Sequence, residues 1–358
     1  MTILRLPFAR AWQNVRENKH CRWCTRAAPP DGRPTPVPAD AARRIHDGFA
    51  KINASVLRPL SQRCFFTIGS CFAQTIEDFL LLRGARVPSA NSIPFEQVPH
   101  LFKLVQPASS KRTFLNRYNL PSMLQELLIL VEGFPPDDPN WLLYENNTKW
   151  CDLHYAWNFH DLSLEECHER RELIFRHLSR ALRDANTYVL TLGLCEAWFD
   201  LKAQSYLNST PPARVTNANP DRFEFHFLDY EDNLRALISI HELLCRLKGK
   251  EEFELVVTVS PVPLNSTFTA SDIVVANAEA KAILRAVAGE AARTLPGFTY
   301  FPSYEIVMYS NQACAWQQDR LHVQNPLTKH VVATFFELLG STARVDGHAA
   351  PAHPSPEV

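Results

Sequence analysis

Short apolar runs alternate with longer amphipathic stretches through the middle of the chain. Three runs have the length and composition of buried strands, and each is followed by a residue that favours a turn. They span 64–68 before Gly69, 187–192 before Gly193, and 253–259 before Ser260. A fourth, weaker candidate strand lies within 300–309. Because helical patterns separate these strands, we expect crossover connections, which produce a mostly parallel sheet.

The helical patterns each show one apolar face. After Gly69, apolar residues recur at positions 72, 76, 79 and 80, and Gly84 ends the segment. Longer patterns predict helices over 164–184, 231–247 and 276–293. The proline-rich stretch 91–149 is helical around 122–131, and we expect an inserted segment or lid there. The predicted fold class is α/β, with helices on both faces of the sheet and functional residues at the carboxyl ends of its strands.

The two ends of the chain differ in composition from its middle. Prolines at positions 29, 30, 34, 36 and 38 crowd a stretch that cannot continue a helix or a central strand. We therefore expect a proline-rich arm over residues 1–59, one domain over residues 60–335, and a flexible tail over residues 336–358. The whole chain has 26 Pro and only 11 Gly. The glycines that do occur at strand ends, Gly69 and Gly193, are thus candidate functional positions.

Charge and apolar content narrow the possible partners. The 37 Lys and Arg residues nearly balance the 38 Asp and Glu residues, and a net charge of −1 gives no broad attraction to nucleic acid. No apolar run approaches the roughly 18 residues that a membrane span requires. The first residues also lack the pattern of an export signal. We expect no nucleic-acid partner and no membrane span, and the sequence leaves the oligomeric state open.

The cysteines predict a reducing compartment. An odd number of cysteines, nine in 358 residues, argues against a disulfide-stapled secreted scaffold, so we expect a cytoplasmic protein. His20, Cys21 and Cys24 form a short cluster, but a zinc site usually needs four ligands and no second closely spaced cysteine pair follows. Neither G-x-G-x-x-G nor G-x-x-x-x-G-K-[ST] occurs in the chain. We therefore expect no metal and no cofactor.

Ser70 lies where the first predicted strand turns into its helix. Unpaired N–H groups and the dipole of a helix N-terminus favour negative charge, so Ser70 suits the role of a nucleophile, and the N–H groups of Ser70 and Cys71 suit an oxyanion hole. The simpler alternative is that Ser70 only caps the helix. Cys71 is either a thiolate nucleophile, since helix N-termini lower the pKa of a thiol, or a structural residue, which we favour.

A serine nucleophile needs a base and a group that orients the base. Asp319 and His322 have the three-residue spacing that lets a carboxylate hold one ring nitrogen while the other faces a serine. Such a spacing also arises by chance in a chain with 13 His, so the pair alone is a weak signal. We expect His154, His160 and His168 to be surface histidines or hydrogen-bonded core histidines.

The turn after the second predicted strand offers further candidates. If the two strands are neighbours, Gly193 lies beside Ser70, and its N–H can donate to an oxyanion. Alternatively, Gly193 only permits a tight turn. Glu196, three residues further on, either fixes the following loop or contacts the substrate.

Several segments of the chain resemble one family. Residues 69–73 spell Gly-Ser-Cys-Phe-Ala, the name-giving motif of the GSCFA family. Further segments resemble family segments in family order: YNLPSM at 118–123, TLGLCEAW at 191–198, TVSPVP at 258–263 and FPSYE at 301–305. The chain is identified as a member of this family over about residues 60–335, and the family is similar to the SGNH/GDSL hydrolases.

This resemblance implies a three-layer α/β/α fold of SGNH type, with Ser70 as the nucleophile and Asp319 and His322 completing a triad. In SGNH enzymes, an Asn side chain also donates to the oxyanion. Cys195 occupies the corresponding position here, and a thiol is a poor hydrogen-bond donor. Asn119 and Asn91, both in the expected inserted segment, are the alternative candidates to supply the missing amide.

The activity that the resemblance implies is serine-dependent hydrolysis or transfer of an O-acyl group. The expected substrate class is a carbohydrate or small-molecule ester, such as an O-acetyl sugar. Trp150, Trp157 and Trp198 are candidates to stack on sugar rings, and core packing explains them equally well. The alternative is a non-catalytic module that binds a carbohydrate or small ligand on the same scaffold, and the departure at Cys195 favours it.

Overall fold

The computed structural model describes most of the chain between residues 6 and 338. The described residues are 6–18, 21–22, 24–27, 35–38, 42, 44–45, 48–52, 63–105, 112, 116–155 and 159–338. Among them, no helix combines the length and the apolarity that crossing a bilayer requires. The expected tail beyond residue 338 lies outside the described residues.

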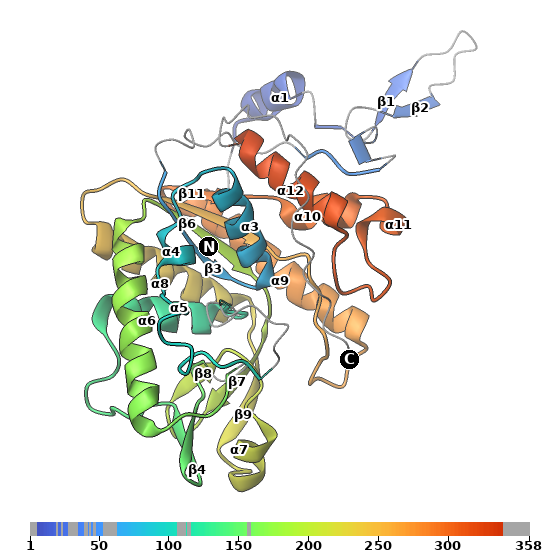
Figure 1. The fold of residues 1–358 in the computed structure, drawn as a ribbon. Coiled ribbons are helices and arrows are strands. Elements are labelled where there is room, and N and C mark those ends of the chain that lie inside the picture. The colour runs from blue at the N-terminus through green and yellow to red at the C-terminus, as the bar shows by residue number, and fades with distance from the viewer. Residues whose placement is uncertain are drawn as a thin grey trace.

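A parallel sheet of four strands forms the centre of the domain (Figure 1). Its strands are β3 (Phe65–Gly69), β6 (Thr187–Leu192), β10 (Glu254–Val259) and β11 (Phe298–Tyr300), in the order β11-β10-β6-β3. The register pairs Thr191 with Gly69 on one side and with Thr258 on the other. Because the strands are parallel, the carboxyl ends of β3, β6 and β10 share one edge of the sheet. This is the edge where the sequence predicts the functional residues.

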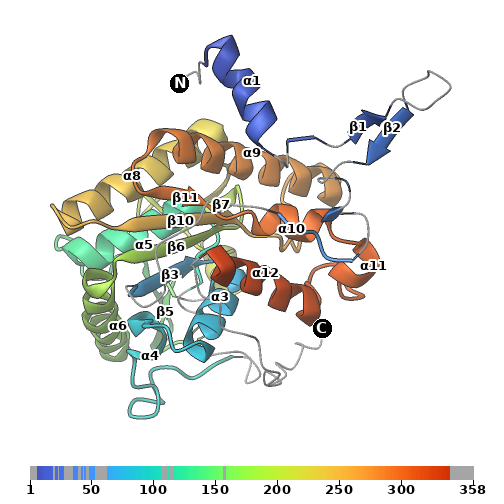
Figure 2. The same cartoon turned by 90° about the horizontal axis from the view of Figure 1, so that it is seen from above.

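Alternating side chains of the sheet pack against helices on both faces. One face, with Phe66 and Leu190, packs in a buried cluster with α5 (Leu120–Glu132), α6 (Leu164–Asp184), α8 (Tyr230–Lys248) and α9 (Ile273–Thr294). The other face, with Phe65 and Val189, packs with α3 (Cys71–Leu82), α10 (Ser303–Tyr309) and α12 (Asn325–Leu338). Figure 2 shows the four strands side by side among these helices. The predicted α/β class is confirmed.

The three longest predicted helices are present as α6, α8 and α9, whose ends lie close to the predicted ones. The fourth predicted strand is wrong in its extent. Only the segment that ends at Tyr300 is a strand, and the residues after Pro302 form α10. The reason is that Ser303, Ile306 and Val307 recur at helical spacing and are buried together.

The segment expected as a lid contributes a helix to the core instead. α5 begins after its N-cap Asn119, with proline in its first turn. Its residues Met123, Leu127 and Leu130 are almost completely buried in the same cluster as the central sheet. A helix whose apolar face packs against a sheet is part of the domain's layered structure.

Short elements that the sequence pattern did not predict complete the fold. An antiparallel sheet in the order β8-β7-β9 is formed by β7 (Glu196–Asp200), β8 (Ser205–Leu207) and β9 (Phe223–Phe227). These strands are short and only partly buried, so they lack a continuous apolar run. The remaining elements are α1 (Phe8–Glu17), β1 (Cys24–Ala27), β2 (Thr35–Pro38), α4 (Pro88–Asn91), β4 (Leu143–Asn146), β5 (Lys149–Asp152), α7 (Ala213–Ala218) and α11 (Gln312–Ala315).

Part of the expected N-terminal arm is attached to the domain. The N–H of Ala50 donates to the hydroxyl of Ser310 over 2.8 Å, and Nε2 of His330 donates to the Ala50 carbonyl over 2.9 Å. The N–H of Asn311 donates to the Gly48 carbonyl over 2.9 Å. Ala50 is completely buried by these contacts. Residues 48–50 therefore pack on the region of α10 to α12.

Candidate active site

Ser70 lies at the sharp junction between β3 and α3, as predicted. Gly69 adopts a φ of +146°, a conformation that side chains strongly disfavour, and Ser70 follows as the N-cap of α3. The N–H of Phe72 donates to the Ser70 hydroxyl over 3.3 Å, which confirms the capping role. Cys71 begins α3, and its side chain lies outside the described residues. The role of Ser70 as a nucleophile stays a prediction at this point.

Thr191 of β6 is the closest polar neighbour of Ser70. Its hydroxyl accepts the Ser70 N–H over 2.9 Å and lies 3.1 Å from the Ser70 hydroxyl oxygen. The Ser70 N–H also approaches the Thr191 carbonyl, at 3.3 Å. In this structure, the Ser70 N–H therefore has its acceptors in Thr191 and is not directed at a substrate. Thr191 was not predicted, because its hydroxyl is one of several in β6 and belongs to no recognised motif.

Gly193 lies beside Ser70, as expected for neighbouring strands. A Cβ at position 193 would be 3.6 Å from the Ser70 Cβ and only 2.8 Å from the carbonyl oxygen of Tyr118. The second distance is shorter than real Cβ contacts, so glycine is needed here for the close approach of two backbones. Among the described residues, no hydrogen-bond acceptor contacts the Gly193 N–H.

Three separate elements hold the Gly193 turn. The N–H of Ser260, after β10, donates to the carbonyl just before Gly193 over 2.8 Å. The ammonium of Lys281 on α9 donates to the Gly193 carbonyl over 2.8 Å. The N–H of Leu194 donates to the Tyr118 carbonyl over 2.8 Å. Lys281 is fully buried, so this turn is part of the interior although it lies at the edge of the sheet.

The other candidate oxyanion residues are engaged elsewhere. The thiol of Cys195 is fully buried and contacts the carbonyl of Ala280 at 3.5 Å, and burial raises its pKa to about 12. The amide of Asn119 donates to the Leu207 carbonyl over 3.1 Å, while its oxygen accepts an N–H in the first turn of α5. Neither side chain donates toward Ser70. The carboxylate of Glu196 accepts the N–H of Phe268 over 3.0 Å, so it fixes the loop after β10.

Asp319 and His322 form a pair in the loop between α11 and α12. The carboxylate of Asp319 accepts the His322 Nδ1 proton over 2.6 Å and also accepts the His322 backbone N–H over 3.0 Å. The hydrogen bond to the ring, followed by the one to the backbone, lowers the pKa of the Asp319 carboxyl to about 2. Nearly half of the His322 side chain is exposed, 47%. The ring nitrogen that is not bound to Asp319, Nε2, is thus available to an incoming group.

Two pairs of predicted site residues are brought together, Ser70 with Gly193 and Asp319 with His322. No hydrogen bond joins Ser70 to His322 in the described part of the chain. The helices that follow Ser70 and His322 cover the same face of the sheet, because Phe72 of α3 and Leu327 of α12 belong to one buried cluster.

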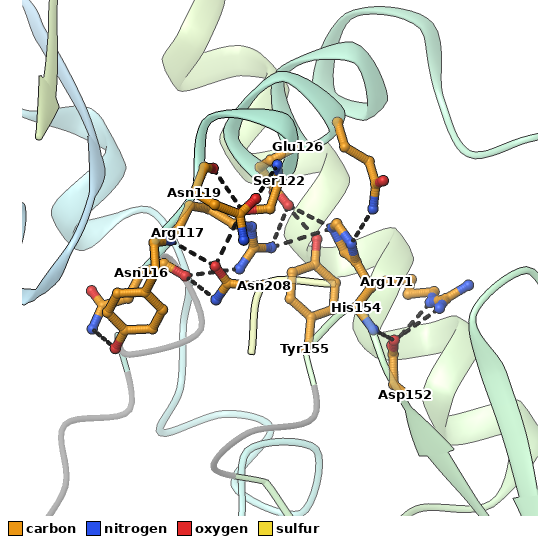
Figure 3. Close-up of polar contacts among 12 residues, drawn as sticks. Asn116, Arg117, Asn119, Ser122, Glu126, Asp152, His154, Tyr155, Arg171 and Asn208 are labelled. Atoms are coloured by element: carbon orange, nitrogen blue, oxygen red, sulfur yellow. Dashed lines mark hydrogen bonds and ion pairs between the residues drawn. The ribbon is translucent and has the colours of Figure 1, made fainter. Parts of the chain in front are cut away.

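Figure 3 shows a buried polar network that includes Glu126, Arg117 and His154. The carboxylate of Glu126 on α5 accepts hydrogen bonds from Arg117 and from the hydroxyl of Tyr155, and lies 2.7 Å from Nε2 of His154. Burial alone raises the pKa of Glu126, but Arg117 and His154 outweigh it and lower the pKa to about 2. The N–H of Arg117 donates to the Gly69 carbonyl over 2.7 Å, which connects the network to the turn.

His154 is a hydrogen-bonded core histidine, as predicted. Its backbone N–H donates to Asp152, which also accepts two hydrogen bonds from Arg171, over 2.8 and 2.9 Å. Burial lowers the pKa of His154, so the ring is held neutral in the interior. The sequence analysis missed its partners, because Glu126 and Arg117 are distant in sequence and show no motif.

A cavity of about 790 Å³ lies away from these residues, between α5, β8 and α8. Its walls include Leu128, Trp141, Phe199, Tyr206 and Arg235. None of the predicted catalytic residues lines it, so we do not assign the candidate site to this cavity.

The structure describes only part of the histidine–cysteine cluster and of the proposed tryptophan set. His20, Trp157 and the Cys24 side chain lie outside the described residues. Within the described ranges, no group of three or more His, Cys, Asp or Glu side chains is placed to hold a metal ion.

Comparison with known proteins adds one positive result. Residues 64–335 match the family model described as GSCFA family. No curated protein matches the chain. The matched range includes all the residues of the β3–α3 junction, the Gly193 turn and the Asp319–His322 pair.

Proposed function

The chain belongs to the GSCFA family, and from this premise we propose that it is a serine-dependent enzyme of SGNH type that hydrolyses or transfers an O-acyl group. Ser70 is the nucleophile, His322 is the base, and Asp319 orients His322. The proposed substrate class is a carbohydrate or small-molecule ester. Among these esters, we favour O-acetyl sugars.

The Asp319–His322 pair is the main support for this proposal. A carboxylate bound to Nδ1 fixes the tautomer in which Nε2 accepts a proton, and this is what a serine nucleophile requires of its base. The pair also lies in a loop that is anchored by an antiparallel bridge between Trp316 and Val323, so its position is not that of a free surface chain.

The proposed reaction conserves protons at each step. The Ser70 oxygen attacks the acyl carbon while its proton moves to Nε2 of His322, and the leaving alcohol then takes that proton as the acyl–serine ester forms. Water or a second hydroxyl reverses the sequence and releases Ser70. The Gly193 N–H and the Cys71 N–H are the donors for the developing oxyanion. For this reaction, Nε2 of His322 has to come within hydrogen-bond reach of Ser70 when substrate binds.

A non-catalytic ligand-binding module is the second candidate, and specific observations favour it. The Ser70 hydroxyl is hydrogen-bonded to Thr191 rather than to a histidine, and the residue is only 4% exposed. The thiol of Cys195 is directed into the core, where it cannot replace an amide donor. A scaffold of this kind binds a ligand at the sheet edge without turning it over.

Covalent labelling and ester hydrolysis distinguish the two candidates. We expect a fluorophosphonate to label Ser70 in the wild type. We expect short-chain ester hydrolysis to fall at least about 10,000-fold in both Ser70→Ala and His322→Ala, since removal of a triad residue lowers kcat by roughly 10⁴- to 10⁶-fold. His168→Ala is the matched control, since His168 contacts only Asn140 on the surface. Absence of labelling in folded wild type, together with ligand binding, would establish the binding module.

The proposal also includes substrate class and compartment. Trp198 packs edge-on against Phe225 and Phe268 at the loop after β10, which leaves it near the sheet edge where a sugar would bind. To test this choice of substrate, the release of acetate from O-acetylated saccharides is compared with the hydrolysis of simple aryl esters.

We propose the cytoplasm as the compartment because the described cysteines are free thiols, most of them buried.

A further inference from the structure

Thr191 occupies the space that Gly69 leaves open. A Cβ at position 69 would lie 2.3 Å from the Thr191 hydroxyl oxygen and 2.6 Å from the Thr191 carbonyl. No side chain fits at such distances. The absence of a side chain at position 69 therefore allows β3 and β6 to approach until the Thr191 hydroxyl reaches both the N–H and the hydroxyl of Ser70.

The direction of the hydrogen bond between the two hydroxyls follows from counting protons. The Thr191 oxygen already accepts the Ser70 N–H, and the described structure gives it no other contact than the Ser70 oxygen. If Ser70 donated to Thr191, the Thr191 proton would have no acceptor in a side chain that is 0% exposed. The satisfied arrangement is the opposite one, in which Thr191 donates to Ser70.

The Ser70 oxygen then accepts two hydrogen bonds, one from the Thr191 hydroxyl and one from the Phe72 N–H. In the described structure, the Ser70 hydroxyl proton is then the part of this side chain that has no hydrogen-bond acceptor in the interior. Ser70 retains a small exposed fraction, 4%, whereas Thr191 has none, so only the Ser70 proton can reach a base from outside.

We propose that Thr191 is a positioning residue that sets the orientation and the proton direction of the Ser70 hydroxyl. This inference rests on the proposed function and extends it to a residue on a different strand. As the Ser70 proton leaves for Nε2 of His322, the two donors stabilise the negative charge that develops on the oxygen. Once the Ser70 oxygen is part of the acyl ester, it is a weaker hydrogen-bond acceptor. Thr191 therefore stabilises the attacking oxygen more than it stabilises the acyl–serine product.

The test compares Thr191→Val, which removes the hydroxyl at nearly constant volume, with Thr191→Ser, which keeps it. The matched control is Thr258→Val on the neighbouring strand, which is in register with Thr191 and equally buried. The Thr258 hydroxyl bonds the Phe301 carbonyl and the Ser303 hydroxyl, not Ser70. Each full-length variant is examined by fluorophosphonate labelling of Ser70, short-chain ester kinetics, thermal unfolding and crystallography.

We expect Thr191→Val to slow labelling and lower kcat by roughly tenfold, with KM nearly unchanged, because one hydrogen bond to the reacting oxygen is lost. Thr191→Ser should recover most of the rate. Thr258→Val should lose thermal stability without slowing labelling. Equal labelling rates in Thr191→Val and wild type, or no recovery in Thr191→Ser, would refute the role of Thr191.

If the wild type is neither labelled nor active, the proposed enzyme function fails, and crystal structures then decide the role of Thr191. A Ser70 oxygen that leaves its place beside the Phe72 N–H in Thr191→Val, but keeps it in Thr191→Ser, supports positioning by the hydroxyl. A Ser70 oxygen that keeps its place in both variants overturns it.

Discussion

At the scale of single residues, the candidate site depends on two places where backbones approach each other without a side chain between them. At Gly69 the neighbour is Thr191, and at Gly193 it is the Tyr118 carbonyl. Both glycines stand at the ends of buried strands, and their position and scarcity predicted them as candidate functional positions. The reason for each was not predictable, because it depends on which strand lies alongside.

Gly69→Ala tests the closer of these approaches. The new Cβ would overlap Thr191 and would have to adopt a φ of +146°, so we expect a loss of more than about 2 kcal/mol in the free energy of unfolding. Gly84→Ala is the matched control, since Gly84, just after α3, also has a positive φ, +71°, but nothing within 4 Å of its Cβ position. Its cost should be about 1 kcal/mol. Urea unfolding measures both, and equal losses would contradict the close approach at position 69.

Other residues of the site show the limit of local patterns. Asp319 and His322 were predictable because they contact each other within one turn of chain. Thr191 acts on Ser70 across two strands that are distant in sequence, and its hydroxyl resembles any buried threonine until the pairing is known. Cys195 stands where the resemblance places an asparagine, and its burial in the core could not be deduced from that position in the motif.

At the scale of elements, α5 supports the turn that carries Ser70. Its Glu126 holds Arg117, and the N–H of Arg117 in turn holds the Gly69 carbonyl. The helix was predicted, but its place in the core was not, because proline-rich flanks resemble an insertion.

For α10, by contrast, the aromatic and branched residues favoured a strand. The segment is nevertheless a helix, whose buried residues recur at helical spacing.

Glu126→Gln tests this support through its pH dependence. The folded pKa of Glu126 is about 2, below its ordinary value of 4.5, so its charge contributes stability above pH 4.5 that is lost as the pH falls toward 2. We expect Glu126→Gln to lose roughly 3 kcal/mol at pH 7, because Arg117 keeps a buried charge without its carboxylate. The difference from wild type should shrink steadily between pH 4.5 and 2.

Urea unfolding at pH 7, 5, 4 and 3 measures this difference. Glu132→Gln, on the same helix, is the matched control, since its carboxylate is exposed and 3.7 Å from Arg246. Its effect should stay below about 1 kcal/mol at every pH. A constant difference between Glu126→Gln and wild type across this range would show that the Glu126 charge does not contribute.

At the scale of the whole molecule, the folded unit extends beyond the residues that the family model matches. That match begins at residue 64, yet Ala50 is buried against Ser310 and His330. The proline-rich composition of the first residues predicted an arm, and composition cannot reveal that a short stretch within it packs on the domain. Contacts between residues so far apart in the sequence produce no periodic pattern of apolar and polar positions.

A pair of truncations measures this contribution. Removal of residues 1–47 keeps the hydrogen bonds of Gly48 and Ala50, whereas removal of residues 1–52 eliminates them and exposes the Ser310 hydroxyl. We expect the longer truncation to unfold with roughly 1–3 kcal/mol less free energy than the shorter one. Thermal and urea unfolding compare the two chains, and identical midpoints would place the domain boundary after residue 52.

The Gly193 turn has one more consequence for the chemistry. Its peptides are held by Ser260, by Lys281 and by Tyr118, which come from three different directions, while its own N–H points at no acceptor in the described structure. A dipole that is already fixed does not have to reorient when charge appears beside it, whereas water molecules do. In the proposed reaction, the interior around Lys281 would hold the Gly193 turn in place, so little free energy would be spent on reorienting its N–H as the oxyanion forms.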